Sequence, residues 1–144
     1  MANNMNTKIE DNTTQNTAAH FAVGRRKRAI ARVRVYVGEG NSTINGKSTA
    51  DYSQTINQKK QLAFPWITSG LAGKYYFTAK VIGGGINSQI GAVTHGVSRC
   101  IAQMSEALHS TMAQNSLLTR DPREKERKKI YHVRARKMPQ FSKR

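Results

Sequence analysis

Residues 24–41 read GRRKRAIARVRVYVGEGN, and they decide the fold because apolar and basic side chains alternate along them. Successive side chains of a β-strand point to opposite faces, so this alternation predicts a strand with two unlike faces. The face expected to enter a core holds Ala29, Ala31, Val33, Val35 and Val37. The opposite face holds Arg26, Arg28, Arg32 and Arg34, together with Ile30 and Tyr36. We therefore expect a sheet that is packed on one face and basic on the other.

The basic face has two interpretations. A run of charges on a strand is most often just a solvated surface. Residues 25–37, however, hold six cations and no acidic residue, so no neighbour in the sequence pairs with them. Guanidinium groups also match the geometry of phosphate. We therefore favour a phosphate-binding surface, whose predicted contacts are Arg25, Arg26, Lys27, Arg28, Arg32 and Arg34.

Turn and strand signals continue after the first strand. Gly38–Asn41 ends it, residues 42–45 (STIN) predict a short partner strand, and Asn45-Gly46 predicts a turn. Residues 74–82 (KYYFTAKVI) alternate again. Here one face holds Tyr75, Phe77, Ala79 and Val81, and the other holds Tyr76, Thr78, Lys80 and Ile82.

Two segments have helical spacing. Tyr52 to Leu71 predicts a helix that breaks near Phe64-Pro65-Trp66, because proline lacks an amide donor and clashes with the preceding turn. Trp66 is expected to pack in the core or against a helix. After the glycines at 83–85, a second helix is predicted by the apolar positions Ile90, Val93, Val97, Ile101 and Met104, and a further helical piece by Leu108 and Met112. Gly91 and Gly96 inside the second helix indicate that another backbone packs closely against it.

Residues suited to catalysis or metal binding show no useful arrangement. The four histidines have no metal-ligand spacing with one another or with Cys100, and Cys100 shares a helix face with apolar residues, which predicts burial. The glycines at 83–85 could cradle a phosphate, but a tight strand-to-helix turn explains them equally well. We expect no enzyme, no metal and no cofactor.

The charge of the chain points to a polyanionic partner. The 144 residues carry 24 Lys and Arg against 8 Asp and Glu, a net charge of +16, which a compact body would tolerate poorly alone. No apolar segment is long enough to span a membrane, and the N-terminus lacks the apolar region of a secretory signal. A single cysteine suits a reducing compartment, so a cytoplasmic protein is expected. Residues 1–20, rich in Asn and Thr, are predicted to be a flexible extension.

Residues 120–144 form a second basic segment, with eleven cations and three acids. Thr119 or Asp121 could cap a short helix that carries Glu124 to Lys129. Beyond Ile130 the apolar periodicity stops, which predicts an extended tail that becomes ordered on a polyanion. A solubilising tail is the alternative, but it would rarely place Tyr131, Pro139 and Phe141 among the cations. Residues 21–119 are then the globular body.

Four blocks together resemble a known family, the bacterial form of small-subunit ribosomal protein nine. They are GRRKRAIARVRVYVGEGNSTING, GGGINSQIGAVTHGVSRCI, LLTRDPREKERKK and the terminal PQFSKR. The resemblance runs from Phe21 to Arg144. It implies an α+β fold, with one four-stranded sheet, helices packed on one side and a left-handed βαβ crossover, as in the second domain of ribosomal protein S five. The chain departs from the family at Thr94, where a cation is usual, and at Ile130–His132.

The resemblance also implies partners: 16S-type ribosomal RNA, the transfer RNA of the peptidyl site and neighbouring proteins of the small-subunit head. No membrane and no homo-oligomer are expected. Ser142, Lys143 and Arg144 match the positions that contact transfer RNA. Ribosomal RNA contacts in the tail are expected from Arg120, Arg123, Arg127, Lys128, Lys129, Arg134, Arg136 and Lys137. The alternatives are a nucleic-acid-binding protein outside the ribosome and an enzyme that binds a phosphorylated ligand at residues 83–85.

Overall fold

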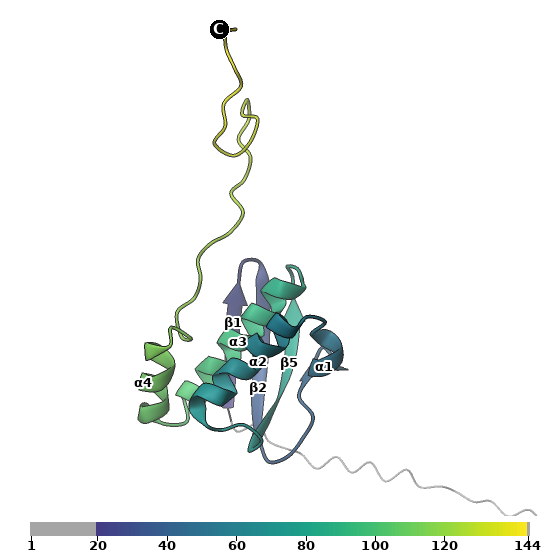
Figure 1. The fold of residues 1–144 in the computed structure, drawn as a ribbon, viewed down its shortest axis with the longest axis vertical. Helices are drawn as coiled ribbons and strands as arrows, with labels where there is room; N and C mark the ends of the chain where they lie inside the picture. The colour runs from purple at the N-terminus through teal and green to yellow at the C-terminus, as the bar shows by residue number, and fades with distance from the viewer. Residues whose placement is uncertain (1–19, 144) are drawn as a thin grey trace, which may run out of the picture.

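The computed structural model describes residues 20–143, in which one mixed sheet is packed against helices (Figure 1). The elements follow in the order β1 (His20–Arg26), β2 (Ala29–Val37), β3 (Thr43–Ile44), β4 (Lys47–Ser48), α1 (Thr49–Tyr52), α2 (Ile56–Ser69), β5 (Tyr75–Ile82), α3 (Ile86–Ala102) and α4 (Glu106–Gln114). The strand order is β1-β2-β5-β3-β4; β3 and β5 are parallel, and all other neighbours are antiparallel. The predicted α+β class is confirmed. The sheet has five strands, whereas the family resemblance implied four, and two of the five, β3 and β4, are only two residues long.

Residues 24–37 form a hairpin, and the prediction of a single strand there is wrong. β1 and β2 pair from His20 opposite Val35 to Arg26 opposite Ala29, and Lys27 and Arg28 make the turn between them. Lys27 adopts φ +49°, in the left-handed region that residues other than glycine rarely enter. The turn has neither the glycine nor the asparagine that usually marks a two-residue hairpin, so the alternation of side chains concealed it.

The core lies between the sheet and the helices, which cover one of its faces (Figure 1). The predicted alternation is confirmed in both long strands. Ala29, Ala31, Val33 and Val35 of β2 and Phe77, Ala79 and Val81 of β5 are buried, and they meet Ile90, Val93, Val97 and Ile101 of α3. Val37 was expected in the core but is 68% exposed at the end of β2. Trp66 packs against this core and stacks on Phe77, with ring centroids 6.2 Å apart.

A close contact between β1 and α3 explains two glycines. A Cβ on Gly24 would clash with the backbone of Ala92 and of Gly96 in α3. A Cβ on Gly96 would lie 2.6 Å from Cγ2 of Val33. The prediction that a second backbone packs against this helix is therefore confirmed at Gly96. At Gly91 the neighbour is instead the side chain of Arg26.

Helix α2 continues through Pro65, so the predicted break is wrong. Residue 65 of an unbroken helix would donate its amide to the carbonyl of Gln61, and proline has no amide hydrogen. The hydroxyl of Thr94 in α3 donates to that carbonyl instead. Helix α2 ends at Gly70, which adopts φ +68°. The short helix α1 is separate from α2 and precedes it in the chain.

Two further expectations concern the N-terminal extension and membrane-spanning segments. The predicted extension over residues 1–20 lies outside the described residues except for His20, which begins β1. No helix within residues 20–143 is long and apolar enough to cross a bilayer.

Candidate nucleic-acid interface

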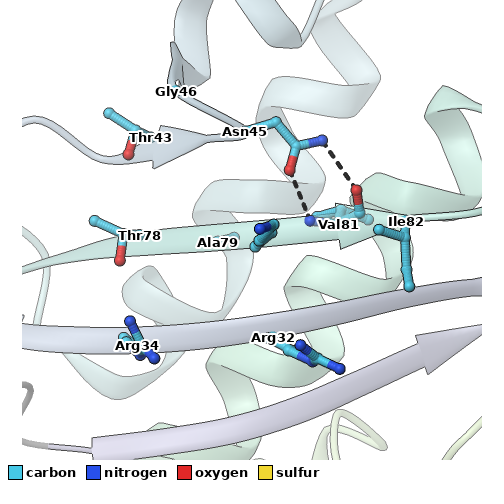
Figure 2. A pocket seen from close by; sticks show the side chains of 10 residues that line it. Arg32, Arg34, Thr43, Asn45, Gly46, Thr78, Ala79, Val81 and Ile82 are labelled. Atoms are coloured by element: carbon cyan, nitrogen blue, oxygen red, sulfur yellow. Dashed lines mark hydrogen bonds between the residues drawn. The ribbon is translucent and has the colours of Figure 1, made fainter.

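The sheet face opposite the helices carries cations on two neighbouring strands. Arg32 and Arg34 of β2 and Lys80 of β5 are all exposed. The register places Arg32 directly opposite Lys80 and Arg34 opposite Thr78. Figure 2 shows both arginines on this face, next to β5. The predicted outward orientation of Arg32 and Arg34 is confirmed, and strand pairing adds Lys80 to them. We call this surface the open face.

A depression of about 730 Å³ lies in the open face between β2 and the β3–β4 turn. It is lined by Arg32, Arg34, Thr43, Asn45, Gly46, Thr78, Ala79, Lys80, Val81 and Ile82 (Figure 2). It forms where β3 stops at Ile44 while β5 continues to Ile82. Asn45 takes the place of the missing strand residues: its Oδ1 accepts the N–H of Val81 at 2.7 Å, and its Nδ2 donates to the Val81 carbonyl at 3.0 Å.

The cations of the open face have no acidic partner. Within residues 20–143, the ion pairs involve the cations of Arg26, Arg120, Arg123, Lys129 and Arg136. None involves Arg32, Arg34 or Lys80. Like charges directly opposite each other on paired strands repel, and Arg32 and Lys80 are such a pair. An anion bound between them would remove this repulsion.

The hairpin separates the four cations at 25–28. Arg25, Lys27 and Arg28 are exposed, and Arg25 lies opposite Ile30, on the same side of the sheet as Arg32. The prediction that Arg26 and Arg28 continue the outward stripe is wrong. Arg28 lies in the turn, and Arg26 points to the helix side, where its side chain crosses Gly91 and its Nη2 lies 3.8 Å from Oδ2 of Asp121.

His95 joins three segments of the chain. Its Nδ1 accepts the backbone N–H of Arg25 at 3.2 Å, so in the neutral ring Nε2 carries the proton and donates to the carbonyl of Leu118 at 3.1 Å. Burial lowers the pKa of His95, and the nearby charges of Arg99 and Arg120 lower it further. His95 thus ties β1 and α3 to the residues that lead into the tail. This role could not be predicted from the sequence, because both partners of the His95 ring are backbone groups.

The first part of the tail is held by carboxylates. Asp121 accepts hydrogen bonds from the guanidinium and the amide of Arg123, which keep the pKa of its carboxyl well below the usual range. The predicted helix over Glu124–Lys129 does not form, and residues 115–143 contain no helix or strand. The Arg123 amide is bonded to the Asp121 side chain, and a helix this short is marginal without an apolar face to bury.

Farther along the tail, the predicted cations differ in their surroundings. Arg120 pairs with Glu124, and Glu126 pairs with Lys129 at 3.8 Å and Arg136 at 2.9 Å. No ion pair forms in the described tail at Arg127, Lys128, Arg134 or Lys137. Ser142 and Lys143 are exposed, as is the whole ring of Phe141. Arg144 lies outside the described residues.

The remaining chemical groups are part of the packed body. Gly83 and Gly84 adopt φ +73° and +66°, and the side chain of Gln89 donates to the Gly83 carbonyl, which favours the tight strand-to-helix turn over a phosphate cradle. Cys100 is buried, as predicted, and burial raises the pKa of its thiol to about 12. Residues 20–143 contain no group of three His, Cys, Asp or Glu side chains suited to a metal ion.

Thr94, where the chain departs from the family, also belongs to the packed body. The Thr94 side chain is 6% exposed, and its hydroxyl contacts carbonyls of α2 and α3. Lys80 and Asn45 also line the open face, although neither was among the predicted contacts. The signal for Lys80 was present: it alternates with buried residues just as Arg32 does, so pairing of the two alternating strands would have brought them together.

Comparison with known proteins agrees with this arrangement. The family model described as Ribosomal protein S9/S16 matches residues 24–144. The chain is 42% identical over 124 residues to a protein of Dehalococcoides mccartyi, covering 86% of this chain and 94% of that protein. It is also 42% identical over 137 residues to a protein of Synechocystis sp., covering 94% of this chain and all of the relative. Both relatives are named small ribosomal subunit protein uS9.

The matched residues include both paired strands of the open face, the buried helix α3 and the whole basic tail. The chain therefore belongs to the Ribosomal protein S9/S16 family.

Proposed function

We propose that this protein is a structural, non-catalytic constituent of the small ribosomal subunit and binds 16S-type ribosomal RNA in the subunit head. It acts in translation as a component of the cytoplasmic ribosome. One observation carries the RNA contact: Arg32 and Lys80 face each other on an exposed sheet face, and no acid within residues 20–143 pairs with them. The family and the names of the relatives support the ribosome as the place of that contact.

The body, residues 21–119, contacts the ribosomal RNA through the open face and through the tip of the β1–β2 hairpin. Arg25, Lys27 and Arg28 at that tip are exposed and add to the positive charge of Arg32 and Arg34. Contacts to phosphate fix the position and orientation of a protein on RNA without reading its sequence. Because such contacts add up, the body is held by many weak interactions.

The tail, residues 120–144, follows the RNA and ends at the transfer RNA of the peptidyl site. Pro139 opposes a helix near the end and favours an extended approach. Ser142 offers a hydroxyl donor, and Lys143 and Arg144 offer two cations to the phosphates of the transfer RNA. All transfer RNAs share that backbone, so the contact does not depend on the anticodon sequence.

Two finer features accompany this function. Parallel strands β3 and β5 are joined by a crossover that contains α1 and α2, and the family resemblance predicts that this crossover is left-handed. Neighbouring proteins of the subunit head are the expected protein partners, and no homo-oligomer is expected.

Charge reversal tests the role of the open face in assembly. In cells, the variant Arg32→Glu/Arg34→Glu should be incorporated into small subunits less well than the wild type, because it replaces attraction to phosphate by repulsion. The matched variant is Lys59→Glu/Lys60→Glu, which makes the same change of charge on exposed positions of α2. The measurement is the ratio of variant to wild-type protein in purified subunits.

Equal incorporation of the two double variants would contradict the assigned RNA contact. A second measurement separates a ribosomal protein from a nucleic-acid-binding protein outside the ribosome. The wild-type protein should stay with small subunits during sedimentation in high salt, whereas a protein held only by counterion release should dissociate.

A further inference from the structure

We infer that the depression in the open face binds an unpaired segment of RNA, with one phosphate held between Arg32 and Lys80. This inference rests on the proposed function and names the RNA class that the body recognises. It adds Lys80, Thr43 and Thr78 to the binding residues that the sequence indicated.

The phosphate position follows from the strand register. Arg32 and Lys80 are directly opposite each other on β2 and β5, both exposed, with Arg34 next along the same face. Two like charges so placed repel each other unless an anion lies between them. A phosphate satisfies both, since the guanidinium can bind it in bidentate fashion and the ammonium as a point charge.

Hydroxyl groups stand beside this position. The register places Thr43 opposite Thr78, and Thr78 opposite Arg34, so the two threonines and the arginine share the open face. Threonine hydroxyls both donate and accept hydrogen bonds, as does the 2′-hydroxyl of ribose. Figure 2 shows Thr43 and Thr78 on adjacent strands at one end of the depression.

An apolar surface lies at the other end. Ile30 and Ile82 are opposite each other on β2 and β5, and they line a small recess with Arg32 and Lys80. Ile82 is 56% exposed, so its side chain is available to a ligand. A base that has left its stack packs well on apolar side chains and on guanidinium planes. A base in a duplex is already stacked and cannot enter such a depression.

An added peptide strand does not fit here. The exposed edge of β5 next to β3 would offer backbone groups to a peptide. The N–H and carbonyl of Val81 are already bonded to the Asn45 side chain, and the carbonyl of Ala79 accepts the Asn45 amide at 2.9 Å. The edge is thus closed along the depression, and binding there depends on side chains.

Photocrosslinking of the full-length protein tests the inference site by site. The probe is a short, unstructured oligouridine that contains 4-thiouridine, and crosslinked peptides are identified by mass spectrometry. Crosslinks are expected within residues 43–46 and 78–82 as well as in the tail. In Arg32→Gln/Lys80→Gln, crosslinks in the body should fall roughly tenfold, whereas those in the tail should not change. The matched variant Lys59→Gln/Lys60→Gln should leave both unchanged.

A fold control is included in the design. Because Arg32→Gln/Lys80→Gln removes a pair of like charges, its melting temperature should equal or exceed that of the wild type. Lys80→Gln alone serves as a milder variant. The same probe annealed to its complement should crosslink to the tail only.

Three outcomes would overturn the inference. These are crosslinks in the tail alone, body crosslinks that survive in both Gln variants of the open face, and equal body crosslinking by the duplex. Displacement of the body crosslinks by a polyglutamate peptide at lower concentration than by oligouridine would identify an acidic protein as the occupant. Any of these outcomes, with the wild-type protein still incorporated into small subunits, would leave the proposed function standing.

Discussion

The hydroxyl of Thr94 in α3 lies 3.2 Å from the carbonyl oxygen of Gln61 in α2, and residue 65 is the proline that cannot donate to this carbonyl. The same hydroxyl lies 3.0 Å from the carbonyl of Ile90 in its own helix. A partly buried carbonyl that lacks a donor is costly, so the hydrogen bond from Thr94 stabilises α2 with Pro65 inside it. Position 94 therefore serves helix packing in this chain.

Replacing Thr94 by valine should destabilise the protein by about 1–3 kcal/mol, because the shape is kept while the Gln61 carbonyl loses its donor. In a Pro65→Ala background the amide of residue 65 can donate to Gln61, so the same replacement should cost less. Chemical denaturation of the wild type, both single variants and the double variant measures this coupling, which we expect to be about 1 kcal/mol. Equal costs in both backgrounds would show that the two residues act independently.

Pro65 shows why a local sequence pattern does not determine where a helix ends. A proline rule applies to an isolated helix, and here a residue 29 positions later supplies the donor. The strands were recognised because alternation is a local property of the chain. The Lys27-Arg28 turn was missed because its backbone is set by the pairing of β1 with β2.

Gly24→Ala should be among the most destabilising single changes in the body. A Cβ at this position would enter the backbone of α3 at Ala92 and Gly96, where no flexible side chain can move aside. We expect a cost of about 3 kcal/mol or more, from overpacking. Gly85→Ala is the matched control, since nothing lies within 4 Å of a Cβ there and φ is −104°, and it should cost less than about 1 kcal/mol. Similar melting temperatures for the two variants would contradict the close contact.

His95 should make stability depend on pH. Its pKa in the folded protein is below the ordinary value of 6.5, so in the range between those two values the unfolded chain binds more protons. The free energy of unfolding should therefore be greatest above about pH 6.5 and should fall as the pH drops from there towards the folded pKa. His95→Gln should flatten this dependence between about pH 8 and pH 5, as measured by urea denaturation at each pH.

The other groups do not obscure this test. The pKa values of Asp121 and Glu126 are lowered from 3.8 and 4.5, so their effects lie at lower pH. His20, His109 and His132 are present in both proteins, and their contribution cancels in the comparison. An unchanged pH profile in His95→Gln would show that burial and the charges of Arg99 and Arg120 do not lower the pKa of His95 in the folded protein.

Parts of the candidate interface were predictable for a simple reason. Arg32 and Arg34 alternate with buried valines, so their outward direction is determined once the strand forms. Lys80 depends on which strands pair, and Arg26 on the position of the turn, and neither can be read from local pattern. The tail offers only composition, because its described residues form no helix or strand.

Deleting Ser142–Arg144 should leave the protein folded and incorporated into the subunit, but should weaken retention of transfer RNA in the peptidyl site. All three residues follow Pro139 in the sequence, and Ser142 and Lys143 are exposed, while many cations upstream remain to hold ribosomal RNA. The deletion removes two cations. Each charge-assisted contact is worth roughly 1.5–3 kcal/mol at most, and water and the terminal carboxylate reduce that value. We therefore expect dissociation of the transfer RNA to become faster by a few-fold to about tenfold.

The measurement is the dissociation rate of the transfer RNA from purified subunits that carry the shortened protein. Arg127→Gln/Lys128→Gln removes the same charge upstream and should leave that rate unchanged. If the shortened protein is fully incorporated and the rate matches that of the wild type, the end of the tail does not hold the transfer RNA.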